Sequence, residues 1–143
     1  MAEAIAGACS EKKALDIVAV DVRKTSGVCD YFVIAGGAST TQVRAISDNI
    51  ARRLEEKGGR IRHTEGAREG LWVLLDCGDV VAHVFLDKTR RYYGLERLWS
   101  RSPQARYRDG RKLVFARAAR RAARPGKAGR AGPKAAPRRR AKK

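Results

Sequence analysis

Apolar and polar positions alternate along the first hundred residues in a pattern that predicts helices and strands in turn. Residues 2–13 are expected to form a short helix. Two nearly continuous apolar runs follow, at 15–22 and 31–35, and each is typical of a central strand that is buried on both faces of a sheet. We expect Gly36 and Gly37 to end the second strand. This order of elements favours an α/β domain.

A capping box predicts the start of the next helix. Ser39 is placed to accept a hydrogen bond from the backbone amide of the third helical residue, and the Gln42 side chain is placed to reach back toward the cap. The helix is expected to end at Gly58 and Gly59, before a short strand near residues 60–64. Its buried stripe is predicted from apolar residues at helical spacing, which are Val43, Ile46, Ile50 and Leu54.

Residues 71–76 and 79–85 predict a β-hairpin, because only Cys77 and Gly78 separate two runs of strand-forming residues. In this register three pairs face one another across the hairpin: Trp72 with His83, Leu74 with Val81, and Asp76 with Asp79.

The two faces of this hairpin differ, because side chains alternate from one face of a sheet to the other. One face is aliphatic and is expected to pack in the core. The other face carries an indole, an imidazole and an acidic rim; its members are Trp72, Leu74, Val81, His83 and Phe85, with Asp76 and Asp79 at the tip. Such a mixed face is typical of an interface with an aromatic anchor, but a helix of the same chain could also cover it, since buried Trp and His are common in single domains. Periodicity leaves both interpretations open.

Cations and aromatic side chains crowd into residues 87–99, which follow the hairpin. The residues concerned are Arg90, Arg91, Tyr92, Tyr93, Arg97 and Trp99. They can form a solvated helix with one buried stripe, or a surface that recognises protein or RNA. The sequence does not separate these alternatives.

Charge is distributed unevenly and divides the chain into two parts. The last 33 residues carry 14 Lys or Arg and no Asp or Glu, whereas the first 110 residues carry 18 Lys or Arg and 15 Asp or Glu. We therefore expect a domain at residues 1–109 and a disordered basic tail at residues 110–143, which has too little apolar surface to offset its ordering entropy. No apolar run approaches the length of a membrane span, and three cysteines without CxxC spacing favour a reducing cytoplasm.

The sequence offers few candidates for catalysis. Gly36 and Gly37, followed by Ser39, are typical of an anion site at a helix N-terminus and of the turn that precedes the metal-binding carboxylates of nucleotidyltransferases. Those enzymes need a pair of carboxylates, and here the following helix offers only Asp48. The two histidines and three cysteines show no metal-ligand spacing. We therefore expect no enzyme activity, no bound metal and no cofactor.

Three segments together resemble the ribosomal silencing factor family, whose members are also called iojap-like proteins. They are DIVAVDVRKTSGVCDYFVIAGGASTTQVRAISDNI at 16–50, HTEGAREGLWVLLDCGDVVAHVF at 63–85 and TRRYYGLERLW at 89–99. The resemblance covers roughly residues 3–103 and leaves the basic extension after Asp109 outside the family pattern. It implies a nucleotidyltransferase-like single domain, a mixed sheet of about five strands flanked by helices, without the catalytic carboxylates.

The resemblance also implies a binding function. Members of the family dock on the large ribosomal subunit through its ribosomal protein numbered fourteen, and thereby block joining of the small subunit and repress translation. The partner-binding residues expected here are Trp72, Leu74, Asp76, Cys77, Gly78, Asp79, Val81 and His83, with secondary contacts from Arg90, Arg91, Tyr92 and Tyr93. Cys77 stands where relatives often have a larger apolar residue.

Two alternatives and two further expectations accompany this interpretation. The chain could instead be an RNA-binding or ribosome-assembly protein that acts through its basic tail, or an enzyme with a nucleotidyltransferase fold. We expect the free protein to form homodimers. We also expect the tail to add nonspecific contacts to ribosomal RNA, because its charge is concentrated and its apolar content is low.

Overall fold

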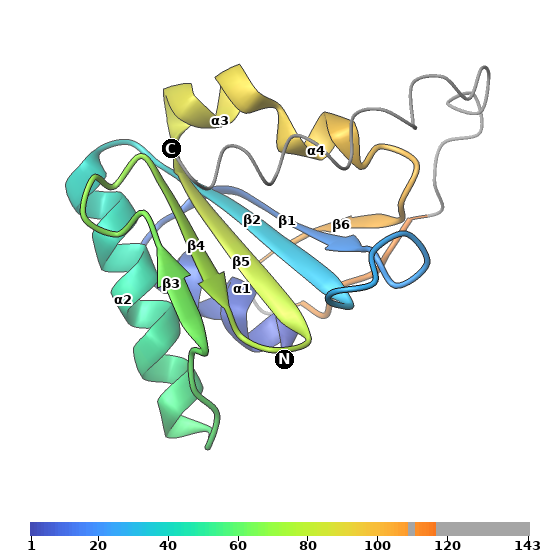
Figure 1. The fold of residues 1–143 in the computed structure, drawn as a ribbon, viewed down its shortest axis with the longest axis horizontal. Coiled ribbons are helices and arrows are strands. Elements are labelled where there is room, and N and C mark those ends of the chain that lie inside the picture. The colour runs from blue at the N-terminus through green and yellow to red at the C-terminus, as the bar shows by residue number, and fades with distance from the viewer. Residues whose placement is uncertain (109–110, 117–143) are drawn as a thin grey trace.

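A six-stranded mixed sheet lies between two pairs of helices (Figure 1). The computed structural model describes residues 1–108 and 111–116. The elements in chain order are α1 (Ala2–Glu11), β1 (Leu15–Asp21), β2 (Tyr31–Gly37), α2 (Thr40–Glu56), β3 (His63–Glu65), β4 (Trp72–Asp76), β5 (Val80–Leu86), α3 (Asp87–Tyr93), α4 (Leu95–Leu98) and β6 (Gln104–Arg106). The predicted mixed α/β class is therefore confirmed, with six strands in place of about five.

The strands lie in the order β3-β4-β5-β2-β1-β6. β2 and β5 pair in parallel at the centre, and the other neighbouring strands pair antiparallel. β1, which we expected to be central, lies next to the edge strand β6, with which it pairs antiparallel. β6 was not predicted, since three residues of mixed polarity show no strand periodicity.

Helices α1 and α2 cover one face of the sheet, over the aliphatic side chains of β4 and β5. The predicted stripe of α2 is confirmed, because Val43, Ile46, Ile50 and Leu54 are all buried. The two helices are joined by Asn49, which is buried and donates to the carbonyl oxygen of Ala8 and to Glu11 at 2.9 and 2.8 Å. The core on this face therefore follows the helical and strand periodicities of the sequence.

The capping box at the start of α2 is confirmed with one difference. Ser39 Oγ accepts a hydrogen bond from the Gln42 amide at 3.1 Å, as predicted. The Gln42 side chain reaches one residue further back than expected, because its Oε1 accepts from the Ala38 amide at 2.6 Å. Its Nε2 donates to the carbonyl oxygens of Lys12 and Lys13. The cap of α2 therefore also holds the segment between α1 and β1.

Strand β2 continues through both glycines that we expected to end it. Gly36 pairs with Phe85 and Gly37 with Leu86 in the parallel ladder. A Cβ atom on Gly37 would come within 2.9 Å of Val43 Cγ2. The glycine therefore permits close packing of α2 against the end of β2, and this close approach does not require the strand to end.

Helices α3 and α4 cover the other face of the sheet (Figure 1). Gly94, in a left-handed conformation with φ of 53°, separates the two short helices. Leu95 and Trp99 pack onto Phe32, Ile34 and neighbouring aliphatic side chains. The face of the hairpin that the sequence left undecided is thus partly covered by the chain itself.

The chain after β6 returns along the domain. Ala116 forms an antiparallel bridge with Gln104, and the Leu113 amide donates to Glu3 at 2.8 Å. Residues 111–116, which we expected in the tail, therefore lie against the sheet and α1. The rest of the predicted tail, 117–143, lies outside the described residues. Within the described part of the chain, none of the helices is both long enough and apolar enough to cross a membrane.

Candidate interaction surface

The hairpin of β4 and β5 turns one residue later than predicted, and the pairing across the two strands therefore slips by two residues. The Cys77 amide donates to the carbonyl oxygen of Val80 at 2.9 Å, so Gly78 and Asp79 form the turn. Gly78 has a φ of 97°, which fits a two-residue turn with glycine in first position. Trp72 consequently faces Phe85 and Leu74 faces His83. Because the slip is of two residues and side chains alternate with period two, the composition of each face is unchanged.

Trp72 is half-buried at the end of β4 that lies furthest from the turn. Its indole Nε1 donates to His83 Nδ1 at 3.1 Å. Its ring lies 4.8 Å from the Phe85 ring and 5.1 Å from the Tyr93 ring, measured between centroids. Gly66 lies directly against the Trp72 backbone, where any Cβ atom would collide with the Trp72 carbonyl oxygen. The indole is therefore fixed by one hydrogen bond and by packing on two sides.

His83 is the buried group that holds this indole. Its side chain is 2% exposed, and burial lowers the pKa of its imidazole to about 3. The ring is therefore neutral at physiological pH, and since Nδ1 accepts from Trp72, the proton lies on Nε2. Nε2 has no hydrogen-bond partner among the described residues. The imidazole meets the Phe32 ring nearly edge-to-face, with centroids 4.9 Å apart.

A row of rings leads outward from Trp72. Tyr93 packs beside it, and Tyr92 follows with its centroid 4.9 Å from that of Tyr93. Tyr92 is 80% exposed, and Leu74 lies half-buried beside Trp72 on the same face of β4. We call these four residues, Trp72, Leu74, Tyr92 and Tyr93, the aromatic surface. Exposed aromatic groups of this kind are enriched at protein interfaces.

The hairpin tip, which comprises Asp76, Gly78 and Asp79, lies at the other end of β4. Asp76 accepts a hydrogen bond from the Gly78 amide at 2.9 Å, and the Asp79 side chain is exposed. The four-residue step from Trp72 to Asp76 spans about 13 Å of strand. Any partner that touches both the aromatic surface and the hairpin tip must therefore follow the length of β4.

Three of the predicted partner-binding residues are buried. Val81 and His83 are 8% and 2% exposed and lie beneath the aromatic surface. Cys77 is 5% exposed and packs on the opposite face, against α1 and α2. The accessible part of the predicted set is thus Trp72, Leu74 and the hairpin tip. Direct contact with a partner remains a prediction for every member.

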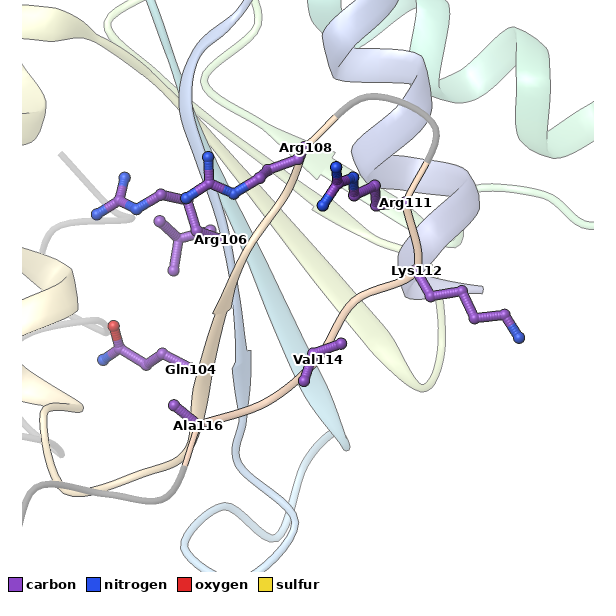
Figure 2. A pocket seen from close by; sticks show the side chains of 8 residues that line it. Gln104, Arg106, Arg108, Arg111, Lys112, Val114 and Ala116 are labelled. Atoms are coloured by element: carbon purple, nitrogen blue, oxygen red, sulfur yellow. The ribbon is translucent and has the colours of Figure 1, made fainter.

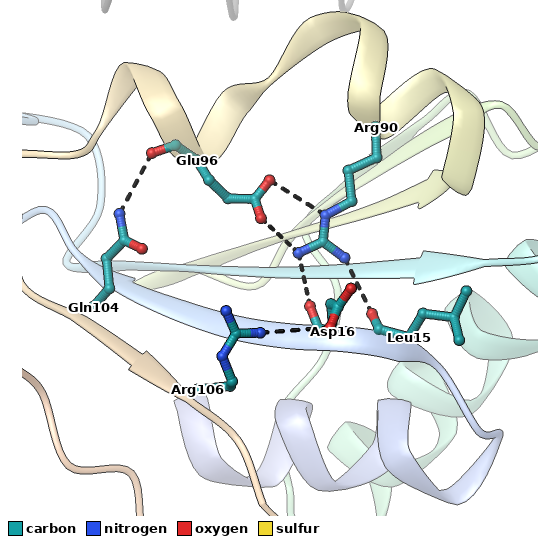
Figure 3. Close-up of polar contacts among 6 residues, drawn as sticks. All are labelled: Leu15, Asp16, Arg90, Glu96, Gln104 and Arg106. Carbon is teal, nitrogen blue, oxygen red and sulfur yellow. Dashed lines mark hydrogen bonds and ion pairs between the residues drawn. The ribbon is translucent and has the colours of Figure 1, made fainter.

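Arg90, which we expected as a secondary contact, is turned inward (Figure 3). It donates to the carbonyl oxygens of Leu15 and Asp16 at 3.1 and 2.7 Å, and pairs with Glu96 at 2.8 Å. Asp16 has a φ of 41°, in the left-handed region that side chains seldom adopt, beside an irregularity in the β1–β2 pairing. Arg90 therefore fixes α3 and α4 to this strained part of β1. Arg91 instead lies exposed and pairs with Asp87.

The other residues that the sequence offered for catalysis, anion binding or metal binding have structural roles. Cys9, Cys29 and Cys77 are free and buried, and burial raises their pKa values to about 12, 11 and 11. Ser39 and Gln42 cap the N-terminus of α2, where the sequence is typical of an anion site. Among residues 1–108 and 111–116, no group of three His, Cys, Asp or Glu is placed to hold a metal ion.

A second surface was missed by the sequence interpretation. A cleft of about 470 Å³ lies at the β6 edge of the sheet, and we call it the basic cleft. Its lining residues are Val18, Gln104, Arg106, Arg108, Arg111, Lys112, Val114 and Ala116. The sequence of residues 112–116 gives no alternating signal, because Leu113, Val114 and Phe115 are all apolar and a basic stretch follows. The alternation of exposed and partly buried positions is visible only in the structure.

The fold and the fixed indole of Trp72 together define an α/β domain that presents an ordered aromatic surface beside its central strands. Residues 1–136 match the family described as "Ribosomal silencing factor during starvation", and the chain belongs to this family. The match extends past Asp109, into the extension that we expected to lie outside the family pattern.

Similar proteins come from bacteria and plants. The chain is 47% identical over 100 residues to ribosomal silencing factor RsfS of Bacillus subtilis, across 70% of this chain and 85% of that protein. It is 35% identical over 98 residues to the chloroplastic protein Iojap of Zea mays, across 68% of this chain and 42% of that protein. A crystal structure from Chromobacterium violaceum gives a TM-score of 0.65 at 36% identity, covering 78% of this chain and 86% of that one. Family membership makes the protein a ribosome-associated factor in translation regulation.

Proposed function

We propose that this protein binds the large ribosomal subunit through the aromatic surface and the hairpin tip, and that it thereby prevents joining of the small subunit. The ribosomal protein numbered fourteen in the large subunit is the proposed contact. The observation that carries the proposal is the state of Trp72, which is half-buried, hydrogen-bonded to His83 and continuous with the exposed ring of Tyr92.

A fixed indole suits an anchor residue, because little conformational freedom is lost when a partner packs on it. Tryptophan and tyrosine are also the residues that most often dominate interface energetics. The exposed carboxylate of Asp79 adds a group that can meet basic side chains of a ribosomal protein. A domain of this size can cover about 800 Å² of its partner, which is enough for a stable and sterically blocking complex.

Sedimentation with purified subunits tests the proposal. The protein should pellet with large subunits and not with small subunits, at a stoichiometry that saturates at one copy. Light scattering should show that 70S formation falls in proportion to the number of large subunits occupied. Inactivation of many ribosomes by one copy of the protein would contradict steric blocking and would indicate an enzyme.

The homodimer that we expect of the free protein would use the same aromatic surface, since Tyr92 exposes 80% of its area there. Two partners cannot occupy one surface, so dimer formation and docking should compete. Light scattering over a concentration series checks this, and a mass that stays monomeric at tens of micromolar would contradict it.

A further inference from the structure

The basic cleft lies between β6 and the segment that returns along it (Figure 2). Four of its eight lining residues are cationic and none is acidic. Arg106 and Arg108 extend from one side, and Arg111 points toward them from the other. Lys112 lies on the rim and points away from the three arginines.

Local packing holds this cleft open. β6 pairs with β1 through Arg106 opposite Val18, and Ala116 bridges to Gln104. Between them, Leu113 and Phe115 turn toward the core, where Phe115 lies 5.5 Å from the Tyr31 ring. Because side chains alternate from side to side along an extended segment, Lys112, Val114 and Ala116 lie on the opposite side, where they line the cleft. The cations are thus arranged by an anchored backbone.

The charges in the cleft are almost unneutralised. Arg106 approaches Asp16 at 3.5 Å, and both side chains are largely exposed. The side chains of Arg108, Arg111 and Lys112 have no hydrogen-bond or ion-pair partner within residues 1–108 and 111–116. Like charges held close together cost free energy unless an anion joins them. An arrangement of this kind favours a polyanionic ligand.

We propose that the basic cleft binds the phosphodiester backbone of RNA. Arginine forks match phosphate oxygens in pairs, and their flat faces stack on bases. Arg106 and Arg108 lie two residues apart, which is about 6.7 Å in an extended chain and suits successive phosphates of one strand. Val114, which is 79% exposed, supplies an apolar wall for sugar or base, and the buried Val18 lies at the base of the cleft. An acidic peptide would leave its polar backbone groups against this wall, so RNA is the better match.

The cleft is separate from the aromatic surface. Both lie on the sheet face that carries α3 and α4, and four strand spacings, roughly 19 Å, separate β4 from β6. A ligand of the cleft therefore need not touch Trp72. The proposal does not depend on which protein binds the aromatic surface, and an RNA probe tests it without ribosomes.

The test is anisotropy of a labelled, short single-stranded RNA of mixed sequence, titrated with the full chain between about 50 and 200 mM salt. The cleft variant combines Arg106→Gln, Arg108→Gln and Arg111→Gln. Three phosphate contacts should be lost, so the slope of log affinity against log salt should become shallower by roughly 2. Affinity at about 100 mM salt should fall tenfold or more. The basic residues after Ala116 are unchanged in every variant and contribute equally.

A matched control removes the same charge elsewhere. Lys57→Gln, Arg60→Gln and Arg68→Gln change three exposed cations that lie outside the cleft. In this control, the slope of log affinity against log salt should change by less than half of the change expected for the cleft variant. A second variant, Phe115→Ala, keeps every charge but loosens the segment that closes the cleft, and should weaken binding about threefold. Arg→Lys replacements at 106, 108 and 111 should retain most of the salt slope, which excludes misfolding as the cause.

Four outcomes overturn the proposal. Equal losses in the cleft variant and the control would show that net charge alone attracts RNA. An unchanged slope in the cleft variant would show that the cleft makes no phosphate contacts. Unaltered affinity of Phe115→Ala would show that the arrangement of the cations is irrelevant. Competition by polyglutamate as strong as competition by RNA would assign the cleft to an acidic protein.

Discussion

The β4 side of the sheet and its β6 edge hold their exposed groups in different ways. On the β4 side, Trp72 is fixed by the His83 imidazole and by neighbouring rings. At the β6 edge, the arginines extend from an anchored backbone and their side chains are nearly unpartnered. A fixed aromatic group binds best to a partner whose surface is complementary to it in shape, whereas exposed cations attract any polyanion. We therefore expect the aromatic surface to determine where the protein docks, and the basic cleft to add salt-dependent affinity.

Arg90 connects the two regions, and its loss should have the largest effect. Arg90→Ala removes the hydrogen bonds from the buried Arg90 side chain to the carbonyl oxygens of Leu15 and Asp16, and its ion pair with Glu96. We expect the free energy of unfolding to fall by about 3 kcal/mol, measured by chemical denaturation. Because α3, α4 and the Asp16 segment all loosen, large-subunit binding and RNA binding should both weaken.

The matched control for Arg90 is its neighbour Arg91, whose side chain is exposed and forms one surface ion pair with Asp87. Arg91→Ala should cost less than about 1 kcal/mol of stability. Similar losses in the two variants would show that Arg90 does not hold the helices to β1.

Trp72→Ala should separate the two regions. Removal of the anchor should weaken binding to purified large subunits by about 2 kcal/mol, or roughly thirtyfold, as measured by sedimentation. Affinity for the RNA probe and its salt slope should stay at the wild-type values, because the basic cleft is untouched. Tyr92→Ala is the control for folding, since its ring is 80% exposed and its loss should leave the melting temperature unchanged. A folded Trp72→Ala protein that docks normally contradicts the assignment of the aromatic surface.

Acid should lower the free energy of unfolding through His83, which supports the β4 side of the sheet. Burial lowers its pKa to about 3, whereas the same side chain in the unfolded chain titrates near pH 6.5. Between these values the unfolded state binds more protons, so this contribution to stability is complete above pH 6.5 and falls by about 1.4 kcal/mol for each pH unit below it. Chemical denaturation at several pH values, followed by tryptophan fluorescence, measures the slope.

His83→Gln provides the comparison for that slope, because glutamine does not titrate. The difference in unfolding free energy between wild type and variant should change with pH in the window from pH 6.5 downward. RNA binding to the cleft should not follow this change, since arginine keeps its charge throughout. Parallel pH profiles for the two proteins would show that His83 is not the titrating group.

The smallest effect is expected at the hairpin tip. The Asp79 side chain is exposed, so Asp79→Lys should leave the fold intact and reverse one charge at the rim of the proposed interface. Large-subunit binding should weaken by up to about 1 kcal/mol at low salt and by less at high salt, because rim charges act through screened electrostatics. Asp48→Lys on α2 makes the same charge change away from the tip and should have little effect. Equal effects of both substitutions would remove the tip from the interface.

Features that depend on neighbouring residues in sequence could be predicted well. The capping box at Ser39 and the apolar stripe of α2 are local, and both are confirmed. The two faces of the hairpin were also correct despite a wrong register, since a slip of two residues preserves the alternation that separates Leu74 from Leu75. The position of the turn was missed because it was placed from the ends of the two runs of strand-forming residues. The preference of such turns for glycine in first position, which favours Gly78 and Asp79, was not used.

Features that depend on distant packing could not be predicted. An arginine is normally expected at the surface, but the Arg90 side chain is buried. Burial is possible because Leu15 and Asp16 of β1 and Glu96 of α4 supply oxygen atoms that accept its hydrogen bonds. His83 is covered by the rings of Trp72 and Phe32, and Val81 lies in the cluster that Leu95 and Trp99 join from the segment after Gly94.

The chain's periodicity by itself determined which side chains share a face, since that depends on the geometry of a single strand or helix. Tertiary structure alone decided which parts of those faces remain exposed. It left Trp72 half-covered, because Phe85 and Tyr93 pack against its ring. It left the arginines at 106, 108 and 111 open to solvent, because β6 and its returning segment pack against β1 and the opposite end of the chain. The exposure of these side chains depends in part on contacts between residues about a hundred positions apart, such as Glu3 and Leu113, and a local sequence pattern cannot predict such contacts.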